Sequence, residues 1–223
     1  MPTRRSLLGL AAGLPLATQL ARVRDALAAG RIEKGVYRVR GDARVNGAPA
    51  KQGQDVRAGD VVTTGPNGEI VFVIARDAML VRANSRVEVS GTVGALVESG
   101  LRIVTGAVLS VFSPGERRRI VTKTATIGIR GTAVYVEAQR DKTYVCTCYG
   151  VADLEATQDP RARETVQTQH HDEPRYVMGL GAPKMIMGAK VVNHTDAELI
   201  FLESLVGRQP PFLDQPGYDP NRY

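Results

Sequence analysis

Short runs of valine and isoleucine, separated by glycine, asparagine, aspartate and proline, dominate the chain from residue 35 to about residue 156. In several runs apolar and polar residues alternate, as in residues 35–41, which is typical of a strand with one buried face. Turn signals such as Asn46-Gly47 and Pro66-Asn67-Gly68 separate neighbouring runs. The pattern therefore predicts an all-β region of many short strands joined by tight turns.

Glycine recurs at the start of several predicted strands. The segments that end at Gly65, Gly106 and Gly131 each precede an apolar run, and glycine lets a chain reverse where a Cβ atom would clash. This punctuation favours a β-helix or β-roll as the fold class, with a β-sandwich as the alternative. Strands are expected at residues 69–74, 78–82, 86–90, 101–104, 107–112, 119–124, 132–138 and 143–149.

The strand pattern continues beyond residue 156 as a smaller extension. Residues 157–164 are polar, which predicts a loop or a hairpin. Residues 164–171 then predict a strand that pairs back onto the sheet. We therefore expect a β extension over residues 157–192 that carries the histidine pair.

The end of the chain predicts one short helix. Thr195 and Glu198 form a capping-box pattern ahead of an apolar set with helical spacing, which Gly207 closes. We expect this C-terminal helix within residues 193–207. Residues 208–223, rich in proline, glycine and tyrosine, are expected to be an extended tail.

Four segments have a more specific pattern. They read Gly-Asp-Ala-Arg-Val-Asn-Gly at 41–47, Gly-Gln-Asp-Val-Arg-Ala-Gly-Asp-Val-Val-Thr-Thr-Gly at 53–65, Asn-Gly-Glu-Ile-Val-Phe at 67–72 and Thr-Ile-Gly-Ile-Arg-Gly-Thr at 126–132. On these segments the chain from residue 35 to about residue 150 resembles the FecR domain family. The matching region is about half of the chain.

The resemblance implies an extracytoplasmic β-helical or β-roll module, which we expect over residues 35–156. In the best-known members this module lies in the periplasm behind a cytoplasmic anti-sigma region and a membrane span, and relays the state of an iron-siderophore transporter. Here only about 34 residues precede it. The resemblance therefore implies a stand-alone module that acts by binding in envelope sensing or signalling, with an envelope protein or a metal ion as partner.

The first residues have the pattern of an export signal. Arg4 and Arg5 precede Ser-Leu-Leu, as in twin-arginine signals, and an apolar stretch covers residues 7–20. Ala-Leu-Ala at 26–28 is typical of a cleavage site, so residues 1–28 are predicted to be a signal peptide and the protein to be periplasmic or otherwise exported. The apolar stretch is shorter than the about 20 residues that a helix needs to span a bilayer, so we expect no permanent membrane span.

Charge and motifs argue against two classes of function. The formal net charge is +6, and half of it comes from the predicted signal peptide. The densest basic run, at residues 117–119, follows a predicted turn, where a solvated loop explains it, so we expect no nucleic-acid partner. The sequence has no Gly-x-Ser-x-Gly elbow, no His-Glu-x-x-His pair and no phosphate-binding glycine loop, and we expect no enzyme.

The chain has two cysteines, Cys146 and Cys148, one residue apart in a predicted strand. Side chains two residues apart lie on the same face of a strand, with Cα atoms about 6.6–7 Å apart. Two thiolates in that position can hold one metal ion. A disulfide would have to leave this geometry, because bridged cysteines usually have Cα atoms about 4.4–6.8 Å apart.

The histidine pair follows the cysteines in sequence. Cys146, Cys148, His170 and His171 are four soft ligands within a short stretch, and they predict a transition-metal site for zinc, iron or copper. In a strand the two histidines face opposite ways, so only one would join both cysteines, unless a turn lets both converge. Asp172 is a further candidate as a ligand or as a partner of a ligand.

Two other interpretations of these residues remain open. The cysteines are also consistent with small apolar core residues, with the histidines as surface polar groups before a turn. A strained, redox-active disulfide between the cysteines is the second. His194 is interpreted as a local polar contact ahead of the helix, and Met178, Met185 and Met187 as core residues rather than copper ligands.

Overall fold

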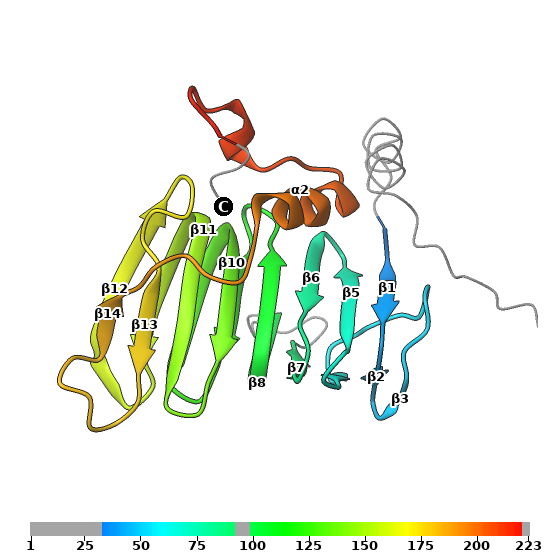
Figure 1. Ribbon diagram of the computed structural model, residues 1–223, viewed down its shortest axis with the longest axis horizontal. Helices are drawn as coiled ribbons and strands as arrows, with labels where there is room; N and C mark the ends of the chain where they lie inside the picture. Colours follow the sequence, from blue (N-terminus) through cyan, green and yellow to red (C-terminus); the bar gives the residue numbers. More distant parts are fainter. Residues whose placement is uncertain (1–32, 92–98, 220–223) are drawn as a thin grey trace, which may run out of the picture.

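The computed structural model describes residues 33–91 and 99–219, which form one 14-stranded sheet, helix α2 and a 3-10 helix, η1 (Figure 1). Among the described strands, β8 and β9 are the one parallel pair, and all other pairings are antiparallel. The elements are β1 (Gly35–Arg40), β2 (Ala43–Val45), β3 (Ala48–Pro49), β4 (Val61–Thr64), β5 (Glu69–Ile74), β6 (Asp77–Val81), β7 (Arg86–Ser90), β8 (Ser99–Val111), β9 (Arg117–Val121), β10 (Ala125–Ala138), β11 (Lys142–Ala156), β12 (Asp159–Thr168), β13 (Arg175–Met178), β14 (Ile186–Gly188), α2 (Asp196–Leu205) and η1 (Pro211–Asp214).

Three long strands fold the sheet into two layers. The first half of β8 pairs with β7 and β9, and its second half with β6 and β10. β10 and β11 change partners in the same way along their length. The changes fall near Gly106, Gly131 and Gly150, which have φ of 85°, 55° and 91°. These left-handed corners are accessible to glycine at little cost and let each long strand belong to both layers.

The centre of the front layer is buried on both of its faces, whereas its outer strands, such as β14, and the back layer are buried on one. β1, β5, β6, β13 and β14 form the front layer with the second halves of β8 and β10 and the first half of β11. β6 is buried at every residue, as expected for a strand covered on two sides. In contrast, β7 and β9 of the back layer alternate between exposed and less exposed residues.

Two apolar clusters follow from this arrangement. The inner cluster fills the space between the layers with aliphatic side chains such as Ile70, Ile103 and Ile127, each fully buried. The outer cluster lies on the opposite face of the front layer, where Leu80 and Leu109 meet the C-terminal elements. Burial of this apolar surface is the main force that holds the layers and the helix together.

Helix α2 packs against β6 and β8 on the outer face (Figure 1). Thr195 is its N-cap: the Thr195 hydroxyl accepts a hydrogen bond from the Glu198 backbone N–H, and the Glu198 carboxylate accepts one from the Thr195 N–H. Leu199 and Leu202 of the helix are fully buried. The capping box fixes where the helix begins, and the apolar side chains fix which face meets the sheet.

The all-β class and the single short C-terminal helix are confirmed. The polar segment 157–164 takes the hairpin alternative, because β12 already pairs with β11 at Asp159 and leaves only Thr157 and Gln158 in the turn. The predicted strand 164–171 ends at Thr168, so the histidine pair lies in the loop that follows.

The tail predicted as extended over residues 208–223 contains the 3-10 helix η1. Pro211 starts this turn with a backbone angle already suited to it, and Phe212 is fully buried in the outer cluster. The prediction was wrong here because composition indicated flexibility, whereas one large apolar side chain holds the segment.

The predicted signal peptide, residues 1–28, lies outside the described residues. Within residues 33–91 and 99–219, no helix has both the length and the apolar character needed to cross a membrane. The boundaries expected at residues 35, 156 and 192 remain predictions. One continuous sheet, from β1 to β14, includes strands on both sides of residue 156.

Candidate metal centre

Strand β11 brings the two cysteines to the outer face of the front layer. Cys146 lies opposite Tyr135 of β10, and both Cys146 and Cys148 are fully buried with free thiols. The two side chains share one face because residues two apart in a strand point the same way. The sequence prediction of a paired-thiol face is therefore realised in the geometry.

His171 reaches the cysteines through a tight turn after β12. The Asp172 carboxylate accepts hydrogen bonds from the backbone N–H groups of Gln169 and His170, both at 3.2 Å. His171 has φ of 54°, a left-handed conformation that is uncommon outside glycine. Its backbone N–H donates to the Cys148 carbonyl at 2.9 Å. This turn, rather than strand alternation, decides which histidine faces the thiols.

His194 completes the group from the segment that precedes α2. Its Nε2 atom lies 3.0 Å from Nδ1 of His171, and its ring stacks on Tyr135 with centroids 4.6 Å apart. The sequence interpretation of His194 as a local polar contact is met by its Nδ1 atom, which lies 2.7 Å from the Val192 carbonyl, but it does not include the contact of Nε2 with His171. The predicted helix cap at Thr195 was the signal that could have drawn attention to this residue.

The four side chains converge on one point. Single ligand atoms from Cys146, Cys148, His171 and His194 all lie within 4.8 Å of one another, and all four residues are buried. Sγ of Cys146 lies 3.5 Å from Nδ1 of His171. For a tetrahedral zinc ion with Zn–S of about 2.3 Å and Zn–N of about 2.0–2.1 Å, neighbouring ligand atoms are about 3.3–3.8 Å apart. The measured distances are close to this range.

The remaining ring nitrogens have acceptor partners. Nε2 of His171 lies 3.0 Å from Oδ1 of Asp196, and Nδ1 of His194 faces the Val192 carbonyl. If these nitrogens carry the protons of neutral rings, the two nitrogens that face each other at 3.0 Å both present lone pairs. Two lone pairs at that distance need a cation between them, either a proton or a metal ion.

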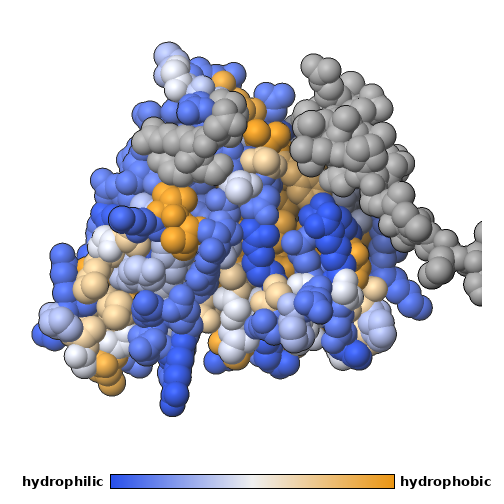
Figure 2. Space-filling model, viewed as in Figure 1, coloured by the Kyte–Doolittle hydropathy of each residue, from blue (hydrophilic) through white to orange (hydrophobic). Residues whose placement is uncertain are grey.

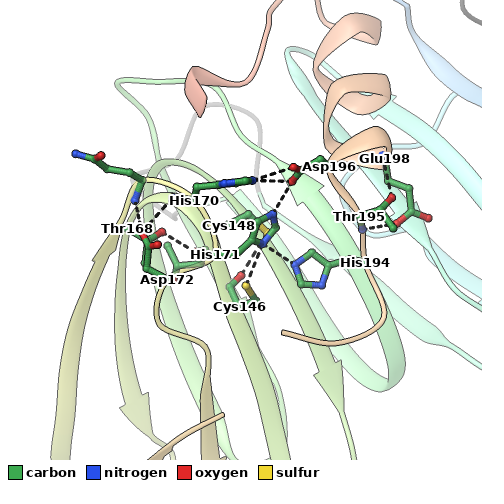
Figure 3. A network of polar contacts seen from close by, with 12 residues as sticks. Cys146, Cys148, Thr168, His170, His171, Asp172, His194, Thr195, Asp196 and Glu198 are labelled. Carbon is green, nitrogen blue, oxygen red and sulfur yellow. Dashed lines mark hydrogen bonds and ion pairs between the residues drawn. The ribbon is translucent and has the colours of Figure 1, made fainter. Parts of the chain in front are cut away.

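His170 does not join the thiols. Its Nε2 atom lies 2.9 Å from both carboxylate oxygens of Asp196, and its ring stacks on Phe212 with centroids 4.5 Å apart. Figure 3 shows Asp196 at the start of α2 between the two histidines, with His171 turned toward Cys146 and His194. Of the four residues predicted as ligands, the structure brings together Cys146, Cys148 and His171, with His194 in place of His170.

Charge stabilises this group in an otherwise apolar setting. Burial would raise the pKa of the Cys146 thiol, but contacts with Cys148 and His171 lower that pKa well below its usual range, while burial and the Cys146 thiolate raise the pKa of Cys148. Burial opposes protonation of His171, yet hydrogen bonds to Asp196 and Cys146 raise its pKa to about 9. Hydrogen bonds from His171 and His170 outweigh burial and lower the pKa of Asp196. The group thus combines a thiolate, imidazoles and a carboxylate, the set found in metal sites.

A surface cavity of about 480 Å³ leads to the histidine side of the group. Asp172, Pro174, Lys190 and Asn193 line it together with His171 and His194. Figure 2 shows that this view of the molecule is largely hydrophilic, with several small, separate hydrophobic patches. The cavity offers a short route for an ion, whereas the sulfur atoms behind it are closed off from solvent.

Comparisons with known proteins do not identify a family for this chain. No protein-family model and no curated protein matches the sequence. Two crystal structures of a candidate anti-sigma factor from Parabacteroides distasonis match with TM-scores of 0.48 and 0.49 at 10% sequence identity. Each match covers 58% of this chain and 59% of the other. A likeness at this level carries no conclusion about function, and the FecR resemblance stays a prediction from the sequence.

Proposed function

We propose that this protein is an exported, FecR-like β module that binds one zinc ion through Cys146, Cys148, His171 and His194. The observation that carries the proposal is the convergence of two sulfur and two nitrogen atoms within 4.8 Å in a buried position. Such a cluster of unmetallated polar groups would be costly in an apolar cluster, and a cation that binds all four offsets this cost.

Zinc is the ion that this ligand set favours. Two thiolates and two imidazoles at tetrahedral distances suit Zn²⁺ better than Mg²⁺ or Ca²⁺, which prefer oxygen ligands. All four ligands come from the protein, which is typical of structural and regulatory zinc sites. A catalytic site would keep one position for water or substrate. Iron and copper are the alternatives that metal analysis distinguishes.

A thiol protease is a second interpretation of these contacts. His171 contacts both Cys146 and Asp196, which is the arrangement of a thiol nucleophile, a base and an orienting carboxylate. Burial argues against catalysis, because the thiols of Cys146 and Cys148 are 0% exposed and no substrate carbonyl reaches them without rearrangement. The proposed module therefore acts by binding rather than by turnover.

The cellular context is proposed from the sequence. The FecR resemblance and the signal-peptide pattern favour a periplasmic module in envelope sensing or signalling, with zinc as one partner and an envelope protein as another. Replacing Arg4 and Arg5 together by lysine is expected to retain the protein in the cytoplasm, as followed by cell fractionation. Unchanged export of that variant would contradict the twin-arginine assignment.

Metal analysis tests the proposal most simply. The protein purified from its host should contain about one zinc per chain, by elemental mass spectrometry and by native mass spectrometry. Cys146→Ser and His194→Gln should each lose the metal, whereas His170→Gln should keep it, because His170 contacts Asp196 and not the thiols. Metal-free wild-type protein that takes up no zinc, or a His194→Gln variant with full zinc, would overturn the proposed site.

A further inference from the structure

The four proposed ligands come from three separate parts of the chain. Cys146 and Cys148 lie on β11, His171 lies in the loop after β12, and His194 lies in the segment that leads to α2. Residues 189–219, which we call the C-terminal cover, include that segment, α2 and η1, and they lie over the outer face of the front layer (Figure 1). A metal held by all four residues would link the cover to the sheet.

The two ends of the cover are held in different ways. Leu199, Leu202 and Phe212 are fully buried, so α2 and η1 are held by apolar packing. In residues 189–195 the single buried residue is His194. Ala189 and Val192 pack against the outer cluster but are only partly buried. The polar contacts of this first segment include hydrogen bonds from the Tyr144 hydroxyl to the Lys190 carbonyl and from Arg82 to the Asn193 carbonyl. Apolar burial therefore holds the entry of the cover, residues 189–195, less firmly than its far end, and His194 is the buried side chain through which a metal would hold the entry.

A chain of contacts connects this entry to the rest of the cover. His171 donates to Asp196 in the first turn of α2, and Asp196 also binds His170. His170 stacks on Phe212 of η1. A change at His171 thus reaches the start of α2 directly and η1 through one further ring (Figure 3).

We propose that zinc acts as a latch, which fixes residues 189–195 and the first turn of α2 against the sheet when it is bound and releases them when it is lost. The inference rests on the proposed zinc site and adds its regulation. Release of the entry uncovers part of the outer face near Cys146, while the apolar packing of Leu202 and Phe212 keeps the far end in place. Zinc occupancy is thereby converted into a local change at the surface.

Hydrogen–deuterium exchange of the full chain, with and without one equivalent of zinc, tests the latch. Peptides over residues 189–197 are expected to exchange about tenfold faster without zinc, a size typical of coupling between a ligand and a nearby segment. Peptides over β5 (Glu69–Ile74) report global unfolding, and the labelling times are kept short enough that β5 stays protected with and without zinc. His194→Gln with zinc present should reproduce the metal-free pattern, and Lys190→Ala in the same segment should behave as wild type.

Each outcome decides between the latch and the site. If zinc binds one per chain and exchange over residues 189–197 does not change, the latch is wrong and the site stands. If residues 189–197 exchange without zinc only at labelling times at which β5 exchanges as well, the cover opens only by global unfolding and the local latch is also wrong. If no zinc binds to the wild-type protein, the site itself fails, and the latch with it.

Discussion

The inner and outer apolar clusters lie on opposite faces of the same strands but differ in composition. The inner cluster contains aliphatic residues with Phe72, Phe112 and Met79, and none of its described members is a tyrosine or a cysteine. The outer cluster contains Tyr135 and Tyr144 with both cysteines, and the buried histidines and Asp196 adjoin it. Strand alternation therefore separates a chemically inert core from a face that carries all of the candidate chemistry.

The difference indicates two kinds of stability in one sheet. The inner cluster is held by apolar burial alone and should respond to cavities and not to metal. The outer face buries ionisable groups whose free energy depends on what they bind. A change in metal occupancy and a cavity in the inner cluster should thus alter the free energy of unfolding independently of each other.

Zinc removal is expected to have the largest effect. At free zinc about 1,000 times above its dissociation constant, binding to the folded state alone adds about 4 kcal/mol to the free energy of unfolding. Urea unfolding with zinc or with a chelator measures this directly. A midpoint that is the same in both conditions would contradict the role given to the outer face.

Ile127→Ala should cost about 3 kcal/mol, because it leaves a cavity in the inner cluster where Ile127 is fully buried. The loss should be the same with zinc and with a chelator, since Ile127 is on the inner face. A loss that depends on zinc would show that the two clusters are coupled, and it would contradict their independent contributions to stability.

Gly106→Ala tests the corner that joins the layers. Gly106 has φ of 85°, and an added Cβ atom would lie 2.1 Å from the Ser85 hydroxyl oxygen and 2.5 Å from the Ser85 Cα atom. We expect a loss of about 2–3 kcal/mol from strain and overlap. Gly47→Ala is the matched control, because Gly47 has φ of 79° and nothing within 4 Å of the added atom, so about 1 kcal/mol is expected. Equal losses would mean that close packing at the corner is unimportant.

Asp196→Asn should have the smallest effect, a 10- to 100-fold weaker zinc affinity. Asp196 does not reach the metal in this account and acts as a positioning residue that orients His171. Competition with a chromophoric chelator gives the affinity, and metal-free unfolding separates it from stability. Asp214→Asn, at an exposed position of η1, should leave the affinity unchanged. If Asp196→Asn binds zinc with unchanged affinity, the Asp196 carboxylate has no role in orienting His171 for the metal.

Local pattern was enough to predict part of this structure. Alternation placed both cysteines on one face, and Thr195 with Glu198 marked the start of α2. The choice of His171 over His170 was not accessible, because it depends on a left-handed residue within a turn and not on strand geometry. His194 was missed because its approach to His171 depends on the path of a segment more than 20 residues further along the chain.

Cobalt substitution tests the central claim most directly. Co²⁺ added to the metal-free protein should give intense visible d–d bands and a thiolate-to-cobalt charge-transfer band, which report a tetrahedral site with sulfur ligands. Cys146→Ser and Cys148→Ser should each weaken the charge-transfer band, and zinc should displace the cobalt. Weak octahedral bands without thiolate charge transfer, or no cobalt binding, would contradict a shared site for Cys146, Cys148, His171 and His194.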